Sequence, residues 1–314
     1  MLRLTKVTMR LRFGSLMFAV SCIASAAAGI LMGIIISQGD QDELSAAPFT
    51  AAGICLIFSV CFSVGTEFSN GTVRNKLIQG YTKTQFYLVQ LVTALTEALI
   101  LCLCAGVPYI LIGWNRFFSL FDTELLVKSL VLMAAGVLLS TAIIVFLCIS
   151  VRNTAYALIV CAGALFLLFT VSNSLDSALT HPEYSKESGG EIEYDPETET
   201  ETEITWEKVV PGKYYVKEPR RTVYTILWKI DPITCLRAAQ DMVSCRDWRE
   251  QHFTVEQNKA LLDKDRAGEG KYLWDIDHLE DRLFGSIYYP IWSGLTVLVL
   301  TGIGILIFRK RNIS

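Results

Sequence analysis

The sequence has few of the residues from which catalytic and metal sites are most often built. Its 314 residues include three His, none of them in a His-Glu-x-x-His arrangement. It has no Gly-x-Ser-x-Gly element of the kind that positions a nucleophilic serine. Neither Gly-Lys pair, at 212–213 and 270–271, is followed by Ser or Thr as in a phosphate-binding loop. We therefore expect no catalytic residue, no metal site and no cofactor bound by this chain.

Charged residues are also scarce over most of the chain. They make up 19% of the sequence, below the quarter that is typical of soluble domains. Residues 176–284 hold 15 basic and 24 acidic residues, whereas the rest of the chain holds 13 basic and 7 acidic ones. This split argues against a single soluble domain. The basic residues form no contiguous face, so nucleic acid is not an expected partner.

Six long runs are free, or almost free, of charge. A helix needs about 20 mainly apolar residues to cross the hydrocarbon core of a bilayer, and each run has at least 23. The runs are 13–39, 44–66, 84–115, 129–151, 153–175 and 285–308. The sequence therefore predicts an α-helical polytopic membrane protein with six transmembrane helices.

Lys and Arg near the ends of the runs predict the orientation, because cytoplasmic loops carry an excess of these residues. The segments that alternate onto one face hold eleven bases, whereas the opposite short loops hold two. We expect residues 1–12 to form a cytoplasmic amphipathic segment and residues 13–175 to hold spans one to five. Residues 176–284 would be extracytoplasmic, and residues 285–314 would form the sixth span and a cytoplasmic tail. The expected location is the cell membrane, as in a bacterial plasma membrane, with both termini cytoplasmic.

The extracytoplasmic segment has a mixed α+β pattern. Residues 181–200 are polar and predict a loop, whereas the alternation over 199–206 predicts a strand. Pro211 and Gly212 indicate a turn into a second strand at 213–217. Residues 222–230 fit a strand or a helix, and three further stretches predict helices: 232–243, 255–262 and 276–284.

Two of the nine cysteines, Cys235 and Cys245, lie in this segment, where a disulfide is chemically allowed. On one straight helix they would be about 15 Å apart, which is too far for a bridge. A disulfide therefore requires a turn between them. Seven cysteines fall in the predicted spans, where a small buried side chain is a sufficient explanation.

The loop between the second and third spans is the most informative segment. Ser69 or Asn70 can cap a helix, and Gly80 can end it in a left-handed conformation. Val73, Leu77 and Ile78 would form its apolar face, with Arg74 and Lys76 beside it. A short amphipathic helix of this kind either lies on the lipid surface or docks into a groove of a cytoplasmic partner.

This loop resembles that of the ABC-2 type permeases, the membrane subunits of many ABC exporters. The resemblance is carried by Glu67-x-x-x-Gly71-Thr72-x-Arg74-x-Lys76 and continues through 80–87. It implies a coupling helix at 69–80 that fits a cleft on a separate ATP-binding subunit, which would hold the ATP and Mg. The residues that it implies for that contact are Glu67, Asn70, Gly71, Thr72, Arg74, Lys76 and Leu77. The 109 residues before the last span depart from compact members of the family.

The resemblance also implies a pair of permease protomers, either a homodimer or a heterodimer. On the first span, Ser21, Ser25, Gly29, Gly33 and Ser37 recur every four residues, and small residues at this spacing allow helices to approach closely. That contact could lie within one chain or between two protomers, and the resemblance favours a dimer.

Glu97 is the only acidic or basic residue inside the six runs. Such a residue normally faces a partner or a cavity. It could line a translocation route, or it could be a protonated carboxyl bonded to a nearby Ser or Thr.

The sequence thus predicts the permease subunit of an ATP-driven exporter that moves a peptide-like or amphipathic substrate outward, with membrane lipid around it. The acidic run at 191–203 could recruit a cationic peptide such as an antimicrobial peptide, or could simply be a solvated face. The alternative function is a membrane-anchored sensor or binding receptor that uses residues 176–284.

Overall fold

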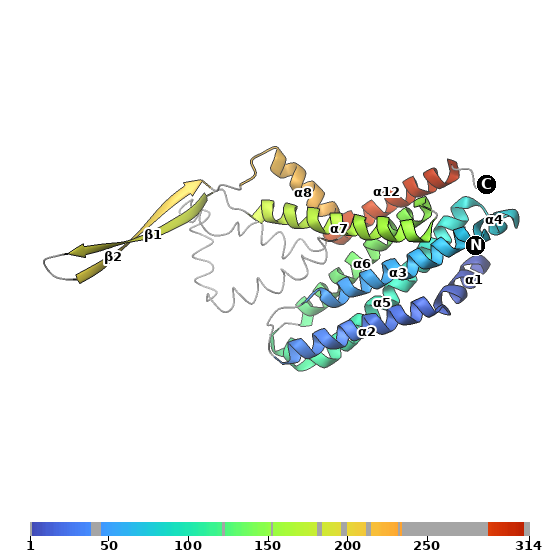
Figure 1. The fold of residues 1–314 in the computed structure, drawn as a ribbon, viewed down its shortest axis with the longest axis horizontal. Coiled ribbons are helices and arrows are strands. Elements are labelled where there is room, and N and C mark those ends of the chain that lie inside the picture. The colour runs from blue at the N-terminus through green and yellow to red at the C-terminus, as the bar shows by residue number, and fades with distance from the viewer. Residues whose placement is uncertain are drawn as a thin grey trace.

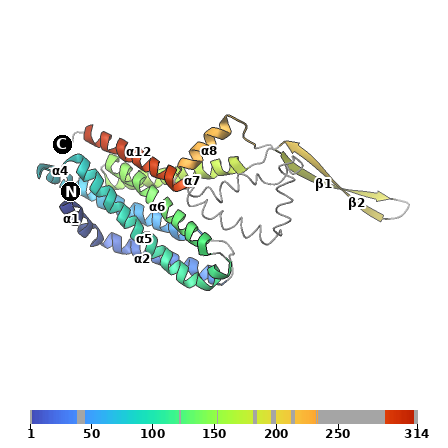
Figure 2. The same cartoon turned by 180° about the vertical axis from the view of Figure 1, so that it is seen from behind.

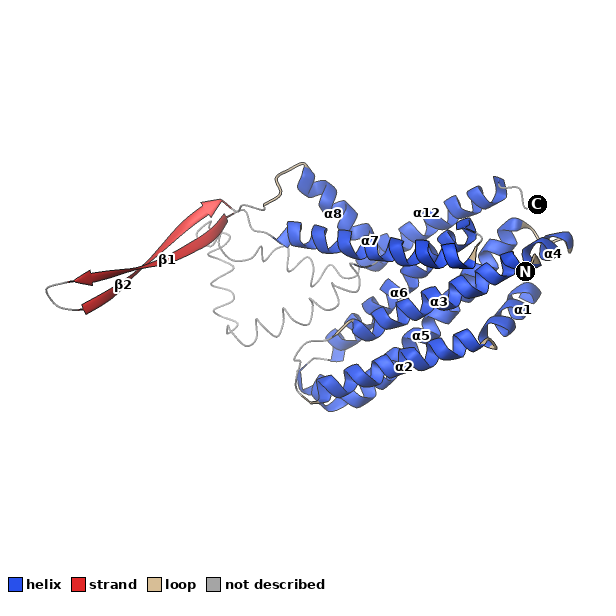
Figure 3. Ribbon diagram, in the orientation of Figure 1, coloured by secondary structure: helices blue, strands red, loops and turns tan. Residues whose placement is uncertain are grey.

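The computed structural model describes residues 2–38, 45–120, 123–151, 153–180, 184–195, 200–211, 215–231, 233 and 288–310. The helices are α1 (Leu2–Phe13), α2 (Leu16–Ser37), α3 (Ala47–Ser69), α4 (Thr72–Ile78), α5 (Lys83–Leu120), α6 (Thr123–Val151), α7 (Thr154–Thr180), α8 (Arg220–Ile230) and α12 (Tyr288–Lys310). Strands β1 (Tyr184–Asp195) and β2 (Thr200–Pro211) separate α7 from α8. The described chain is therefore almost entirely helical (Figure 3).

Five helices are long and apolar enough to cross a membrane. These candidate spans are Leu16–Ser37, Ala47–Ser69, Lys83–Asn115, Ser129–Val151 and Thr154–Leu179. They coincide with the first five predicted runs, so the expected helical membrane character is confirmed. The sixth run falls on α12, a helix of 23 residues. That α12 also crosses the membrane stays a prediction.

The long helices pack side by side into a bundle (Figure 1). Helix α5 contacts α2, α3, α6 and α12, whereas α3 also contacts α6 and α7. Both chain ends lie at the end of the bundle that carries α4, and the two strands extend beyond the opposite end. The view from behind shows the same arrangement (Figure 2). We refer to the end with α4 as the α4 end.

Helices α2 and α5 approach each other closely because α2 presents small residues. Its buried residues are Ser21, Ser25, Gly29, Gly33 and Ile36. A Cβ atom at Gly29 would overlap the Ala105 carbonyl, and one at Gly33 would lie 2.9 Å from the Ile112 Cβ. The small-residue face on the first span is therefore filled within the chain. This face is therefore not available for the expected contact between two protomers.

Three aromatic rings join α3, α5 and α12 at the α4 end. Phe68 and Phe86 have ring centroids 6.0 Å apart, and the Phe308 ring lies 6.3 Å from the first and 5.8 Å from the second. One turn before Phe308 on α12, a Cβ atom at Gly304 would collide with the Tyr87 ring. These contacts hold α12 against the other helices.

The two strands form an antiparallel hairpin in which Tyr184 is opposite Pro211 and Asp195 is opposite Thr200. The expected strand at 199–206 is confirmed over 200–206, the part that the structure describes, but its predicted partner is wrong. Residues 184–195 supply the partner strand instead of 213–217, and they are not the loop that their polarity predicted. Polarity was misleading because a hairpin that extends away from the bundle can be solvated on both faces.

Beyond the hairpin, residues 222–230 are helical, as one of the two interpretations expected. This helix, α8, packs against α7, and Arg221 donates a hydrogen bond of 3.4 Å to the Leu179 carbonyl. The predicted helices at 255–262 and 276–284, almost all of 232–243, and the Cys235–Cys245 pair lie outside the described residues.

Candidate functional site

Two glycines in the left-handed conformation lie on either side of helix α4. Helix α3 ends at Ser69, and the Asn70 amide still donates to the Thr66 carbonyl at 2.9 Å. Gly71, at φ 67°, immediately precedes α4, and no side chain caps the start of that helix. The expected capping role of Ser69 or Asn70 is therefore wrong, because the chain reverses through a left-handed residue that glycine adopts without strain. Gly80, at φ 93°, has the expected left-handed conformation after the helix.

The helix has one face against the bundle and one free face. Val73 is buried, and Leu77 packs against the core. Ile78, which was expected on the same apolar face, is 74% exposed. Arg74 and Asn75 are also exposed. The free face therefore combines one cation with one large apolar side chain.

Lys76 points inward and not toward a partner. Its Nζ lies 2.9 Å from Glu67 Oε2, and both side chains are mostly shielded from solvent. The same Nζ lies 5.5 Å from the centre of the Phe86 ring, within the range of a cation–π contact. Glu67 also accepts a hydrogen bond of 2.8 Å from Gln90 Nε2. Glu67 and Lys76 thus fix α4 to α3 and α5, so their expected direct contact with another subunit is not available in this conformation.

Of the remaining residues expected at that contact, Asn70 is exposed between α3 and α4, whereas Gly71 and Thr72 are half-buried at the start of α4. Arg74 is the one fully outward-facing charged residue of the set.

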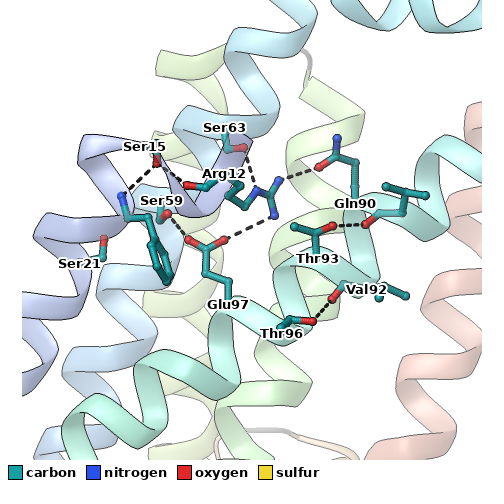
Figure 4. Close-up of polar contacts among 12 residues, drawn as sticks. Arg12, Ser15, Ser21, Ser59, Ser63, Gln90, Val92, Thr93, Thr96 and Glu97 are labelled. Atoms are coloured by element: carbon teal, nitrogen blue, oxygen red, sulfur yellow. Dashed lines mark hydrogen bonds and ion pairs between the residues drawn. The ribbon is translucent and has the colours of Figure 1, made fainter. Parts of the chain in front are cut away.

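Arg12, at the end of α1, is buried among α3 and α5 (Figure 4). Its Nη2 donates to Gln90 Oε1 at 2.6 Å, and its Nε donates to Ser63 Oγ at 2.8 Å. Its Nη1 lies 3.5 Å from Glu97 Oε2. Sequence reasoning missed this residue because Arg12 precedes the first uncharged run and was assigned to a cytoplasmic segment. A four-residue spacing was the available signal, since Leu4, Thr8 and Arg12 are the buried residues of α1.

Glu97 is fully buried and bonded at both oxygens. Ser59 Oγ donates to Oε1, and Arg12 supplies the countercharge at Oε2. The expected serine partner is therefore present, together with a cation that sequence reasoning did not include. The carboxylate faces the contact of α1, α3 and α5, and its residue is 0% exposed.

These interactions join into one series, which we call the polar chain: Lys76, Glu67, Gln90, Arg12, Glu97 and Ser59. It connects α4 at one end of the bundle with Glu97, which lies 14 residues, or about 21 Å, into α5. Each member is held by at least one other member. A displacement of α4 therefore has a direct polar route to the interior of the bundle.

Three cysteines also meet, contrary to the expectation that no span offers a metal-ligand cluster. Cys61, Cys148 and Cys161 come from α3, α6 and α7, are buried, and have sulfur atoms all within 4.8 Å of one another. We call them the thiol cluster. No sequence motif indicates it, because its members lie 87 and 13 residues apart.

The helices and the buried polar chain define a helical multi-pass membrane protein. A scan against protein-family models finds no match, and no curated protein matches the sequence.

Proposed function

We propose that the chain is the permease subunit of an ATP-driven ABC exporter, which moves a peptide-like or amphipathic substrate outward. Separate ATP-binding subunits would hold the ATP and Mg and would supply the energy. A second permease protomer would complete the translocation route. In this proposal α12 is the sixth span, both termini and α4 are cytoplasmic, and residues 176–284 form a mixed α+β domain on the outer face of the cell membrane.

The polar chain is the observation that supports the proposal most directly. A coupling helix has to present a surface to the ATP-binding subunit and transmit that subunit's movement inward. Arg74 and Ile78 of α4 are exposed and offer such a surface. On the opposite side of the same helix, Lys76 is bonded to Glu67. One short helix thus combines an open face with a connection to the bundle.

The mechanism follows from these two faces. Closure of the ATP-binding subunits would move α4 as a unit, because Val73 and the Lys76–Glu67 pair fix it to α3 and α5. Gln90 would pass the displacement from Glu67 to Arg12, and thus to α1 and Glu97. A buried network of this kind favours discrete arrangements over gradual deformation, which suits a switch between two access states.

Affinity purification of the tagged full-length chain in mild detergent tests the proposal. We expect an ATP-binding-cassette protein to co-purify with the wild type, and an adjacent reading frame encoding such a protein would supply it for co-expression. Arg74→Glu should lower its recovery at least tenfold. Lys6→Glu is the matched control, because it reverses an exposed charge on α1 that lies outside α4.

Two outcomes would count against the proposal. If no nucleotide-binding protein is recovered with the wild type, the result favours the alternative function, a receptor that acts through residues 176–284. If such a protein is recovered equally well with Arg74→Glu, α4 is not its docking element.

A further inference from the structure

We propose that Cys61, Cys148 and Cys161 form a binding site for a soft monovalent metal ion, Cu(I), inside the helix bundle. This inference is independent of the exporter proposal, because it rests on the thiol cluster alone.

The sulfur positions fit a three-coordinate metal. Cys61 Sγ lies 3.3 Å from Cys148 Sγ, which lies 3.7 Å from Cys161 Sγ. A metal bonded to three sulfurs at about 2.3 Å would place those sulfurs about 4.0 Å apart. To surround an ion, the Cys61–Cys148 sulfur separation would widen by about 0.7 Å and the Cys148–Cys161 separation by about 0.3 Å.

The donor set selects the metal. Thiolates favour soft ions such as Cu(I) and Zn(II), whereas Ca²⁺ and Mg²⁺ require oxygen ligands. A structural zinc site is almost always four-coordinate. Among the described residues, the cluster brings together three His, Cys, Asp or Glu ligands and no fourth. Three soft ligands without a fourth therefore fit Cu(I) better than a structural zinc ion.

The surroundings keep water away from the ligands. All three side chains are fully buried, so water does not compete for the ion. Binding the metal releases the thiol protons, because thiolates are the ligands.

The thiol cluster lies near the ends of the helices that carry it. Cys148 lies three residues before the end of α6, and Cys161 lies seven residues after the start of α7. These separations are about 5 and 11 Å along the helices, so the cluster is close to the α4 end of the bundle. A bound ion would join α3, α6 and α7, which are otherwise held by side-chain packing.

Competition for Cu(I) tests the site. The full-length chain would be purified anaerobically in detergent with a reductant, then mixed with Cu(I) buffered by the chromogenic chelator bicinchoninate. We expect one equivalent of copper per chain to be withdrawn from the chelator. Cys148→Ser should reduce the copper retained at the same chelator concentration at least tenfold. Cys102→Ser is the matched control, because Cys102 is also a buried cysteine of a spanning helix but lies outside the cluster.

X-ray absorption at the copper edge of the loaded wild type gives a second readout that needs no variant. Three sulfur neighbours are expected. A coordination shell dominated by nitrogen or oxygen would overturn the proposal, as would equal copper retention by Cys148→Ser and the wild type. Peptide mapping that finds a Cys61–Cys148 disulfide in freshly purified protein would also overturn it, because a disulfide removes two of the three ligands.

Discussion

The Arg12 guanidinium lies 3.5 Å from the Glu97 carboxylate, and both side chains are almost completely shielded from solvent. This pair joins the first helix of the chain to the middle of α5. Without it, each partner would be an isolated charge in the interior of the bundle, which is costly in a membrane protein. The pair therefore makes α1 a structural part of the bundle.

Removing one partner should destabilise the protein more than removing both. Glu97→Met leaves Arg12 buried without a countercharge, and loss of one member of a buried pair typically costs about 3–5 kcal/mol. Arg12→Met combined with Glu97→Met should recover most of that loss, because two apolar side chains can fill the same space. Thermal unfolding in detergent, with loss of the monodisperse peak as its readout, measures the difference in stability between the single and double variants.

The matched control is Arg10→Met, which removes an exposed cation from the same helix and should leave the unfolding temperature unchanged. A double variant that is no more stable than Glu97→Met would show that the two charges do not depend on each other.

Gln90→Leu should leave binding of the ATP-binding subunit intact while it weakens the coupling of ATP hydrolysis to the permease. Gln90 joins Glu67 to Arg12 through hydrogen bonds of 2.8 and 2.6 Å, and its substitution leaves the Lys76–Glu67 and Arg12–Glu97 pairs in place. In the proposed exporter, the ATP-binding subunit should still co-purify with this variant. Stimulation of its ATPase activity by the permease should fall several-fold.

Glu97→Gln tests the inner end of the same polar chain, because it keeps an acceptor for Ser59 and removes the countercharge of Arg12. If both Gln90→Leu and Glu97→Gln leave transport and ATPase coupling at wild-type levels, the polar chain has no role in transmission.

Gly29→Ala should weaken the contact between α2 and α5. The new methyl group would meet the Ala105 carbonyl, which belongs to backbone and cannot rotate away. Overpacking of this kind costs about 1–3 kcal/mol. Gly53→Ala is the control, since nothing lies within 4 Å of a Cβ atom at that position of α3. Equal unfolding temperatures for the two variants would contradict the close approach.

Tag accessibility should reveal which side of the membrane the hairpin occupies. An epitope inserted between β1 and β2 should bind antibody on intact cells. The same epitope at the amino terminus should bind only after the cells are permeabilised, because both termini lie at the end of the bundle opposite the hairpin (Figure 1). The reverse pattern would invert the proposed orientation.

The helices were predictable because a bilayer demands long uncharged runs, and five of the runs coincide with candidate spans. A short helix before Gly80 was predictable, and Gly80 has the expected conformation, but Gly71 precedes the helix in place of the predicted cap at Ser69 or Asn70. The inward direction of Lys76 was not predictable. A seven-residue helix is too short for its charge pattern to show which face meets the bundle.

The interior contacts depend on tertiary packing, which no local pattern encodes. Arg12 and Glu97 are 85 residues apart, and the thiol cluster draws on three helices. Strand 184–195 was missed because its polar sequence lacks the alternation produced when one face of a sheet is buried. Its identity as a strand comes from pairing with 200–211.

The position of Arg12 also has a consequence for biosynthesis. Arg12 leaves the ribosome 85 residues before Glu97, an interval of roughly 4–17 s at about 5–20 residues per second. During that interval α2 and α3 can enter the membrane, but the countercharge of Arg12 does not yet exist. Helix α1 therefore reaches its final position only after α5 has been inserted. The contacts of α1 with the bundle are therefore completed out of chain order, after those between α2 and α3 can form.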